Sequence, residues 1–457
     1  MELKNIHSVY FLGIGGIGMS ALARWFKHNG KAVSGYDRTE TALTAKLQDE
    51  GLTIHFDDSV EAIPASIKQS TEEVLVVYTP AIPTNHQGLQ WLRAREYQVL
   101  KRSEVLGVIT ENMKSVAVAG THGKTTTSSM IVHLLKTAGM DCTGFLGGIS
   151  ANYNTNMILN EKAESIAVIE ADEFDRSFLT LHPDLAVVTA ADADHLDIYG
   201  DKDALKDSFK QFIKQIKGNG HLFVKNDLAK ELIGDTVLSH TGYSLNEGGV
   251  KSANLRIEDS AFVFDYNNGS KDIEGVRLNV PGYHNVENML AAIAVSRALG
   301  ADDESIKRGV RSYKGVKRRF EFVHKSEQVT FIDDYAHHPV EIEVLLRSVR
   351  DLFPGKKITA VFQPHLFTRT RDFAEGFSES LSLADEVILL DIYPARELPI
   401  EGVTSDLLLK NIKAAKKTIS TKQNLVSQIQ VWNPEVLLTI GAGDIDKLVE
   451  PIKNSLS

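Results

Sequence analysis

The chain has 457 residues, about three times the length of a typical domain, so the sequence predicts two or three domains. Apolar residues make up 43% and charged residues 24%, a globular balance that excludes a disordered or collagen-like chain. The chain has 50 basic and 60 acidic residues, so its net charge is −10, which argues against a nucleic-acid partner.

Membrane spans and disulfides are also excluded. The longest apolar runs, such as 289–295, are far shorter than the ~20 residues that span a bilayer. No secretory signal pattern opens the chain, and Cys142 is the only cysteine, which excludes a disulfide framework or a multi-cysteine metal site. We expect a cytoplasmic protein with small-molecule chemistry and no membrane insertion. The sequence carries no signal for the oligomeric state.

Strand-like apolar runs alternate with helical patterns, which is typical of α/β layers on buried parallel strands. In chain order the runs lie at 9–12, 32–36, 74–77, 116–119, 166–169, 185–189, 329–332, 358–362, 387–390 and 436–440. Residues 251–279 predict antiparallel strands that decorate the middle domain, with a turn at 267–269. Breaks near 110–115 and 313–315 predict three domains, over residues 1–109, 110–314 and 315–457.

A first glycine turn lies in residues 8–20, which read SVYFLGIGGIGMS. A strand leads into Gly13, Gly15 and Gly18, and a helix follows, so backbone N–H groups can approach a diphosphate at the helix N-terminus. Asp37 follows the next strand, where a Rossmann fold places its ribose ligand. The turn predicts nucleotide or diphosphate binding, with a nicotinamide cofactor as the obvious candidate from this turn alone. Close helix–strand packing is the structural alternative.

A second glycine turn lies in residues 115–127, which read SVAVAGTHGKTTT. It is a short variant of the phosphate-binding loop, in which Lys124 neutralises β/γ-phosphate charge and the Thr125 hydroxyl can hold Mg²⁺. Simple helix capping by the threonines is the alternative, but capping does not require Gly-Lys. The residues expected to cradle the phosphates are Gly120, Thr121, His122, Gly123, Lys124, Thr125 and Thr126.

Acidic residues follow the next two predicted strands. Glu170 opens the run EADE after 166–169, where a phosphate-loop fold places a metal ligand. Asp192, Asp194 and His195 follow 185–189, and His195 is a candidate second metal ligand or a group that orients water. Taken alone, each would be a solvated loop side chain.

Two polar clusters lie on either side of the second predicted boundary. In PGYHNVEN, Asn285 and Asn288 stand three residues apart at a helix start and could read a base edge, with N-capping as the alternative. In GVKRRFEF, Arg318 or Arg319 could reach a γ-phosphate, with a surface basic pair as the alternative.

Three further clusters, DDYAHHP, QPHLFTRTRD and DIYPARE, each follow a predicted strand of the last domain. Ligands bind at the carboxyl ends of strands in open α/β sheets, so these clusters predict one shared pocket. Arg369 and Arg371 could clamp a carboxylate or phosphate there. A metal site at His337 and His338 is disfavoured, because adjacent histidines on a loop point apart.

Together and in this order, these runs resemble the Mur ligase family from about residue 8 to residue 443. The opening turn, DDYAHHP and YPARE point to the alanine-adding branch. The resemblance implies an N-terminal Rossmann-like domain for a UDP-sugar, a central ATPase with a mostly parallel sheet, and a C-terminal Rossmann-like domain. It also implies that ATP, with Mg²⁺, converts the lactyl carboxylate of UDP-N-acetylmuramate to an acyl phosphate, which L-alanine attacks to give the amide.

The resemblance also implies roles for individual residues. Those around ATP and Mg²⁺ are Lys124 for phosphate, Thr125, Glu170 and His195 for the metal, Asn288 for adenine, Arg319 for the γ-phosphate and Asp334 for the ribose. Those around the incoming amino acid are Tyr335, His337, Arg369 and Arg371, with His337 as a candidate base for the amine. Those around the UDP-sugar are Gly15, Gly16 and Gly18 at the diphosphate and Asp37 near the uridine.

Other readings remain open at this point. A relative within the family reattaches a recycled tripeptide to the same sugar nucleotide and shares the opening turn and DDYAHHP. A nicotinamide-dependent oxidoreductase would use the first turn but leaves the second unexplained. A non-catalytic nucleotide sensor would keep the second turn without turnover.

Overall fold

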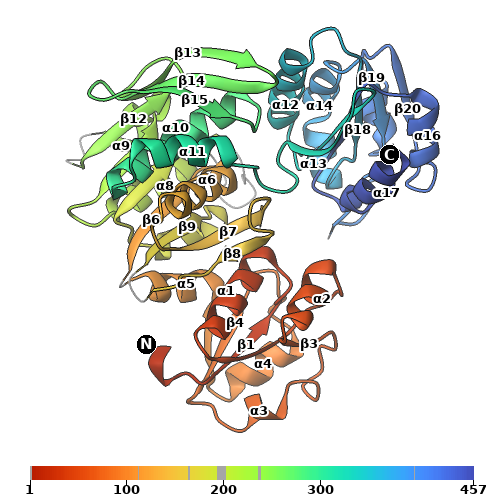
Figure 1. Ribbon diagram of the computed structural model, residues 1–457. Helices are drawn as coiled ribbons and strands as arrows, with labels where there is room; N and C mark the ends of the chain where they lie inside the picture. Colours follow the sequence, from red (N-terminus) through yellow and green to blue (C-terminus); the bar gives the residue numbers. More distant parts are fainter. Residues whose placement is uncertain are drawn as a thin grey trace. The chain divides into compact units, whose positions relative to one another are not determined.

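The computed structural model describes residues 3–111, 113–162, 165–192, 202–234, 238–395 and 397–456. It contains three α/β domains, each built on one mostly parallel sheet (Figure 1). By contacts the chain forms two compact units: the first runs to Asn254 and includes Phe264–Val276 and Glu287–Tyr313, and the second holds Leu255–Val263, Arg277–Val286 and the chain from Lys314 onward. No helix among these described ranges is long and apolar enough to cross a membrane.

The first sheet has the strand order β3-β2-β1-β4-β5, with every neighbouring pair parallel. Its elements are η1 (Leu3–Asn5), β1 (Ser8–Leu12), α1 (Ile17–His28), β2 (Ala32–Tyr36), α2 (Ala42–Asp49), β3 (Thr53–His55), α3 (Ala65–Lys68), β4 (Val74–Tyr78), α4 (Gln87–Ala94), β5 (Gln98–Lys101) and α5 (Arg102–Thr110). The order reverses at β1, so the turn after β1 lies at the switch point where such sheets bind ligands.

The second sheet has ten strands in the order β15-β14-β13-β12-β11-β10-β6-β9-β7-β8, and the pair β7–β8 is antiparallel. Its strands are β6 (Lys114–Ala119), β7 (Cys142–Ser150), β8 (Thr155–Ile158), β9 (Ile166–Ala171), β10 (Leu185–Val188), β11 (His221–Lys225), β12 (His240–Ser244), β13 (Val250–Glu258), β14 (Ala261–Asn267) and β15 (Ile273–Leu278). Its helices are α6 (Lys124–Thr137), η2 (Phe174–Thr180), α8 (Lys202–Lys214), α9 (Asn226–Ile233), α10 (Tyr283–Leu299) and α11 (Asp303–Ser312). The strands predicted within 251–279 are confirmed as the β13–β15 end of this sheet.

The third sheet has the order β16-β17-β21-β18-β19-β20, in which β16 and β17 pair antiparallel and the other neighbouring strands described here pair parallel. Its strands are β16 (Glu321–Lys325), β17 (Thr330–Asp334), β18 (Ile358–Phe362), β19 (Glu386–Leu389), β20 (Lys416–Ile419) and β21 (Val436–Ile440). Its helices are α12 (Pro339–Leu352), α13 (Phe367–Asp372), α14 (Ala374–Leu381), α15 (Ser405–Leu409), α16 (Leu425–Trp432), η3 (Asp444–Leu448) and α17 (Val449–Ser455). Figure 1 shows α12 and α14 on one side of this sheet and α16 and α17 on the other.

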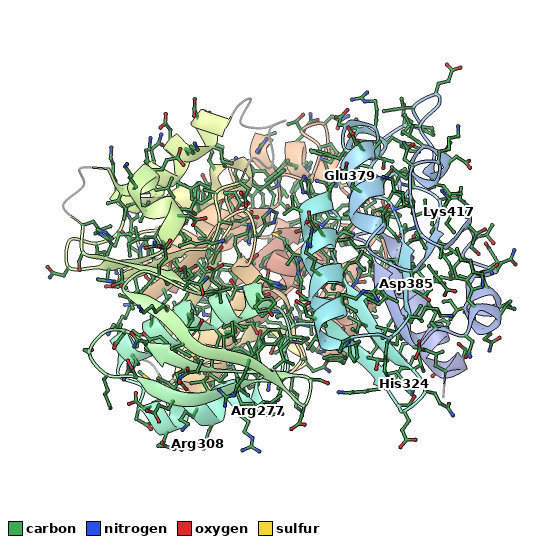
Figure 2. All side chains as sticks on the ribbon, turned by 90° about the horizontal axis from the view of Figure 1, so that it is seen from above. Arg277, Arg308, His324, Glu379, Asp385 and Lys417 are labelled. Atoms are coloured by element: carbon green, nitrogen blue, oxygen red, sulfur yellow. The ribbon has the colours of Figure 1, made fainter. Side chains whose placement is uncertain are left out.

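Burial on both faces explains why the central strands read as unbroken apolar runs. Every residue of β18 and β21 is buried, and helices cover both sides of the third sheet. Asp385 is labelled in Figure 2. It fixes the start of β18, because its carboxylate accepts the Ile358 N–H at 2.8 Å and pairs with Arg350 at 2.9 Å.

A buried polar joint connects α1 of the first sheet with β8 of the second, within one compact unit. The Arg24 guanidinium forms two bonds to the Glu50 carboxylate, at 2.7 and 2.9 Å, and also donates to the Asn156 amide oxygen. Asn156 is completely buried, and its nitrogen donates to the Ser20 hydroxyl at 3.0 Å. One apolar cluster runs from Phe11 through α1 into the second domain. The first two domains therefore share a core.

Candidate active site

The first glycine turn lies between β1 and α1, as predicted. Gly13 has a φ of 90°, a left-handed conformation that suits glycine, and its N–H donates to the Tyr36 carbonyl at 2.8 Å. The N–H of Gly15 donates to Asp37 Oδ2 at 2.7 Å, and Gly16 is the N-cap of α1. The structure thus brings Asp37 onto the predicted turn, where its carboxylate accepts the hydrogen bond of the Gly15 N–H.

Arg102 lies against this turn, and the sequence did not single it out. A methyl group on Gly18 would lie 2.6 Å from Arg102 Nη1, so the end of this arginine side chain lies close to the turn. The Arg102 guanidinium also pairs with Asp172 Oδ2 at 3.5 Å. The arginine therefore stands between the first glycine turn and the acidic run that follows β9.

The second glycine turn is held against the end of the neighbouring strand β10. Gly123 has a φ of 81° and is the residue before α6, which begins at Lys124. The Thr189 hydroxyl donates to the carbonyls of Ala119, at 3.1 Å, and His122, and the Thr121 hydroxyl accepts the Asp192 N–H at 3.1 Å. These contacts hold the turn at the N-terminus of α6, where the sequence predicts a phosphate site.

Lys124 is held by a carboxylate that the sequence did not assign. Its ammonium donates to the Gly120 carbonyl at 2.7 Å and to both oxygens of Glu173, at 2.9 and 2.7 Å. Glu173 is completely buried. Burial lowers the pKa of Lys124, but Glu173, Asp172 and Glu170 outweigh it and raise the pKa overall, while burial raises the pKa of Glu173.

The other acids of EADE have separate partners. Glu170 Oε2 accepts the Gly147 N–H at 2.8 Å, and Asp172 Oδ1 accepts the Phe174 N–H at 3.1 Å at the start of η2. Within the described ranges no three His, Cys, Asp or Glu side chains are grouped as a metal site requires. The predicted ligand His195 lies outside the described residues, as does Asp194.

Asn288 lies beside the second turn, because a methyl group on Gly123 would be 2.9 Å from its Oδ1 atom. The alternative interpretation, in which Asn285 is the N-cap of the helix, is excluded. Helix α10 begins two residues earlier, at Tyr283, and the Asn285 amide donates to the Pro281 carbonyl at 2.6 Å instead of accepting a helix N–H.

In the third domain, Asp334 organises the loop that carries the two arginines. Its oxygens accept the N–H groups of Phe320, at 2.6 Å, and Ala336, at 2.7 Å. Burial raises the pKa of Asp334 to about 6, although Arg319 opposes this shift. The Tyr335 ring lies under both Arg318 and Arg319, at 5.2 and 4.9 Å from their guanidinium carbons.

Arg318 and Arg319 differ in their remaining contacts. Arg318 pairs with the buried Asp333 at 3.3 Å and donates to the Gly441 carbonyl at 2.6 Å, so it ties two strand ends together. Arg319 instead acts on His284, whose pKa is lowered to about 4 by burial and then by the positive charge of Arg319.

The three strand-end clusters of the third domain do converge. The ring of His337 lies 6.3 Å from that of His365, which stacks on Tyr393 at 5.7 Å. His337 Nδ1 donates to the Tyr335 carbonyl at 3.1 Å and lies 3.4 Å from Glu341, so Nε2 carries the lone pair. Burial lowers the pKa of His337 despite Glu341, and Arg369 lowers it further.

The two predicted arginines of α13 have different surroundings. Arg369 lowers the pKa values of both His337 and His365, so its charge lies near the histidines, although burial is the larger cause in each case. Arg371 is half exposed and pairs with the adjacent Asp372 at 2.7 Å. Their contacts to an amino acid remain predictions.

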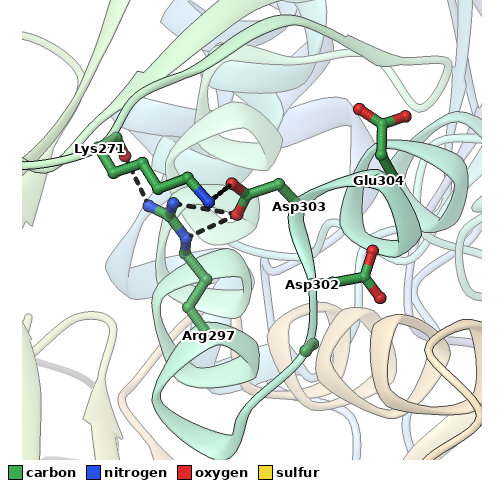
Figure 3. Close-up of a pocket in the computed structure, with 6 residues that line it drawn as sticks. Lys271, Arg297, Asp302, Asp303 and Glu304 are labelled. Atoms are coloured by element: carbon green, nitrogen blue, oxygen red, sulfur yellow. Dashed lines mark hydrogen bonds and ion pairs between the residues drawn. The ribbon is translucent and has the colours of Figure 1, made fainter.

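A hollow of about 520 Å³ lies elsewhere, beside α10 and the start of α11 (Figure 3). Arg297 pairs there with Asp303 at 3.0 Å and donates to the Lys271 carbonyl at 2.7 Å, while Asp302 caps α11 through the Ser305 N–H. Lys271 and Arg297 both pair with Asp303, and none of these residues belongs to the predicted site.

Comparisons with known proteins find relatives along nearly the whole chain. Three family models match in order: "Mur ligase family, catalytic domain" at residues 8–114, "Mur ligase middle domain" at 118–296 and "Mur ligase, glutamate ligase domain" at 318–443. The chain is 49% identical to UDP-N-acetylmuramate–L-alanine ligase of Flavobacterium johnsoniae, covering 100% of this chain and 99% of the relative. It is 47% identical to the enzyme of that name from Cytophaga hutchinsonii, covering 99% and 97%.

A solved structure supports the same grouping. The crystal structure of UDP-N-acetylmuramate–alanine ligase from Thermotoga maritima matches with a TM-score of 0.83 and 28% identity, covering 98% of this chain and 99% of that one. A murein peptide ligase from Psychrobacter arcticus, at 20% identity and a TM-score of 0.70, shares the fold. Full-length identity near one half, together with the two glycine turns and the strand-end clusters, shows that the chain belongs to the Mur ligase family.

Proposed function

We propose that this chain is an ATP-dependent ligase that joins L-alanine to the lactyl carboxylate of UDP-N-acetylmuramate, in peptidoglycan precursor synthesis. The phosphate-binding loop that ends in Lys124 carries the proposal, in a chain 47% and 49% identical over nearly its whole length to two ligases of this name. The proposal includes a cytoplasmic location, which a single cysteine in 457 residues supports.

The reaction follows from the poor reactivity of a carboxylate. A carboxylate oxygen attacks the γ-phosphorus of ATP, the bond from that phosphorus to the β–γ bridging oxygen breaks, and ADP leaves. The amine of L-alanine then attacks the carbonyl carbon of the acyl phosphate, the carbon–oxygen bond to phosphate breaks, and the amide forms. Lys124, whose pKa is raised, stays protonated and balances the charge that the transferring phosphoryl group carries.

Two described residues suit Mg²⁺, which prefers oxygen ligands. Thr125 offers a hydroxyl in the first turn of α6, and Glu170 offers a carboxylate near the end of β9. The bond from the Gly147 N–H takes one lone pair of Glu170 and leaves further acceptor capacity. Bound Mg²⁺ supplies charge neutralisation at the phosphates. His195 stays the proposed third ligand.

The amine of the incoming amino acid has to lose a proton, and His337 is our candidate base. Burial lowers its pKa, so the imidazole is neutral near pH 7, and the bond from Nδ1 to the Tyr335 carbonyl leaves Nε2 as the acceptor. The remaining assignments of the proposal are Gly15, Gly16, Gly18 and Asp37 for the UDP-sugar, Asn288, Arg319 and Asp334 for ATP, and Tyr335, Arg369 and Arg371 for the amino acid.

A phosphate-release assay with UDP-N-acetylmuramate and ATP fixed, across a panel of amino acids, tests this function. We expect release that requires the sugar nucleotide and is fastest with L-alanine. Equal or faster release with L-alanyl-γ-D-glutamyl-diaminopimelate would assign the tripeptide-recycling reaction instead. Saturable binding of NADH in place of turnover would favour an oxidoreductase.

A further inference from the structure

Glu173 is a buried acid that no step of the proposed reaction uses. It is completely buried, and both of its oxygens lie within 2.9 Å of the Lys124 ammonium. The turn that carries it is fixed on both sides, since Asp172 accepts the N–H groups of Phe174 and Phe178, and the Glu173 carbonyl accepts the Arg176 N–H at 2.9 Å. The local backbone therefore directs this carboxylate inward.

The contact resembles the one that a phosphate would make with the same lysine. A carboxylate presents two anionic oxygens to an ammonium, much as a phosphoryl group does. Lys124 is only 13% exposed, so each charge of the pair needs the other, and removal of either leaves an uncompensated buried charge. A polyphosphate that reaches Lys124 has to replace Glu173 or share the lysine with it.

We propose that Glu173 is a counter-ion that Lys124 exchanges for the phosphates of the nucleotide, and that it thereby limits nucleotide affinity. It is a positioning residue, because it holds the lysine extended beside the Gly120 carbonyl before ATP arrives. It also lowers affinity for ADP, which favours product release. This inference rests on the proposed function in one respect, that Lys124 binds the nucleotide.

The direct test compares wild type with Glu173→Gln by titration calorimetry with ADP. The neutral amide no longer competes for Lys124 and no longer repels phosphate, so ADP should bind about tenfold more tightly. Thermal unfolding gives a second readout. Without ADP the variant should melt below wild type, and saturating ADP should close most of that gap.

The matched control is Glu161→Gln, because Glu161 pairs at 3.4 Å with Lys136 of the same helix but is 80% exposed. This variant should bind ADP as wild type does. Unchanged or weaker ADP binding by Glu173→Gln would overturn the counter-ion role.

A second substitution guards against misfolding of the amide variant. Glu173→Asp keeps the charge but shortens its reach to Lys124, so ADP should bind more tightly than to wild type, by less than the tenfold expected above. Unchanged or weaker binding overturns the proposal here too. Wild type that binds neither ADP nor ATP in the same titration would remove the proposed function itself, whereas wild-type binding without a variant effect removes only the counter-ion.

Discussion

The two glycine turns of the first compact unit have the same plan and different chemistry. Each turn follows a parallel strand and precedes a helix, and a carboxylate of the protein forms a hydrogen bond to each turn or to the first residue of its helix. At the first turn Asp37, which is partly exposed, accepts a backbone N–H of Gly15. At the second, the buried Glu173 holds a charged side chain. The carboxylate of the first turn therefore binds a backbone amide, whereas the carboxylate of the second turn neutralises the charge of Lys124.

Removal of the cation should have the largest effect. Lys124→Ala should lower kcat/KM by at least a hundredfold, since one charged donor at a transferring phosphoryl group contributes about 3 kcal/mol or more. It should also lower the melting temperature, because Glu173 remains as an unpaired buried charge. Phosphate release and thermal unfolding measure the two effects.

The double variant Lys124→Ala/Glu173→Gln separates them. It should regain stability and stay inactive, since the buried charge is gone and the cation is still missing. Near-normal turnover by Lys124→Ala would show that the second turn does not carry the chemistry.

Filling the first turn should have an intermediate effect. In Gly15→Ala the methyl group would lie 2.6 Å from the Thr44 methyl and 2.8 Å from Asp37 Oδ2, so the acid and the turn must shift. We expect UDP-N-acetylmuramate to bind about tenfold more weakly, by calorimetry. Unchanged affinity would show that the sugar nucleotide does not use this turn.

Gly16→Ala is the informative neighbour of that variant. Gly16 has a φ of −65°, and its added methyl group would meet nothing closer than 3.5 Å. Its folding stability should match wild type. Any loss of sugar-nucleotide affinity in this variant therefore reports contact with the ligand and not a distorted turn.

Acid should affect the helix of the second turn more than the helix of the first. His133 of α6 is buried, bonds to the Tyr153 and Ser312 hydroxyls at 2.9 Å each, and has its pKa lowered by burial from 6.5 to about 4. The folded state therefore holds fewer protons here than the unfolded state between those values. The neutral, buried imidazole therefore adds to the free energy of unfolding. This contribution is complete above pH 6.5 and is lost as the pH falls toward 4.

The measurement is urea unfolding of wild type and His133→Gln at pH 7 and pH 5. Wild type should lose on the order of 1–2 kcal/mol more than the variant over this interval. His28, the corresponding histidine of α1, is exposed and serves as the control position. Equal losses in wild type and His133→Gln would show that the buried imidazole does not set acid stability.

The sequence predicted features that depend on local pattern. Buried strands read as apolar runs, and Gly-Lys after a strand predicts a phosphate loop, so β1, β6 and Lys124 were found. The partners of those features were missed. Within EADE, the sequence could not tell which acid turns toward Lys124, because the backbone leaves the strand after Ala171 and the alternation of side chains ends there.

Arg102 and His365 were missed for a related reason. Arg102 reaches Gly18 from a helix more than 80 residues later, and His365 meets His337 and Tyr393 only because β17, β18 and β19 end at the same edge of the third sheet. These side-chain contacts depend on the order of the strands in the sheet, and the hydrophobic periodicity of the sequence does not specify that order. The edge itself was predictable, but the side chains that fill it were not.

The buried joint at Asn156 has a practical consequence for anyone who wishes to dissect the enzyme. A fragment that ends near Thr110 would leave α1 with Arg24 lacking one acceptor and with an apolar face stripped of its cover. A fragment that ends near Tyr313 retains both turns and the joint. The shorter piece should therefore precipitate or stay molten on expression, whereas the longer one keeps the core that the first two domains share but lacks Arg319 and Asp334, which the proposal assigns to ATP.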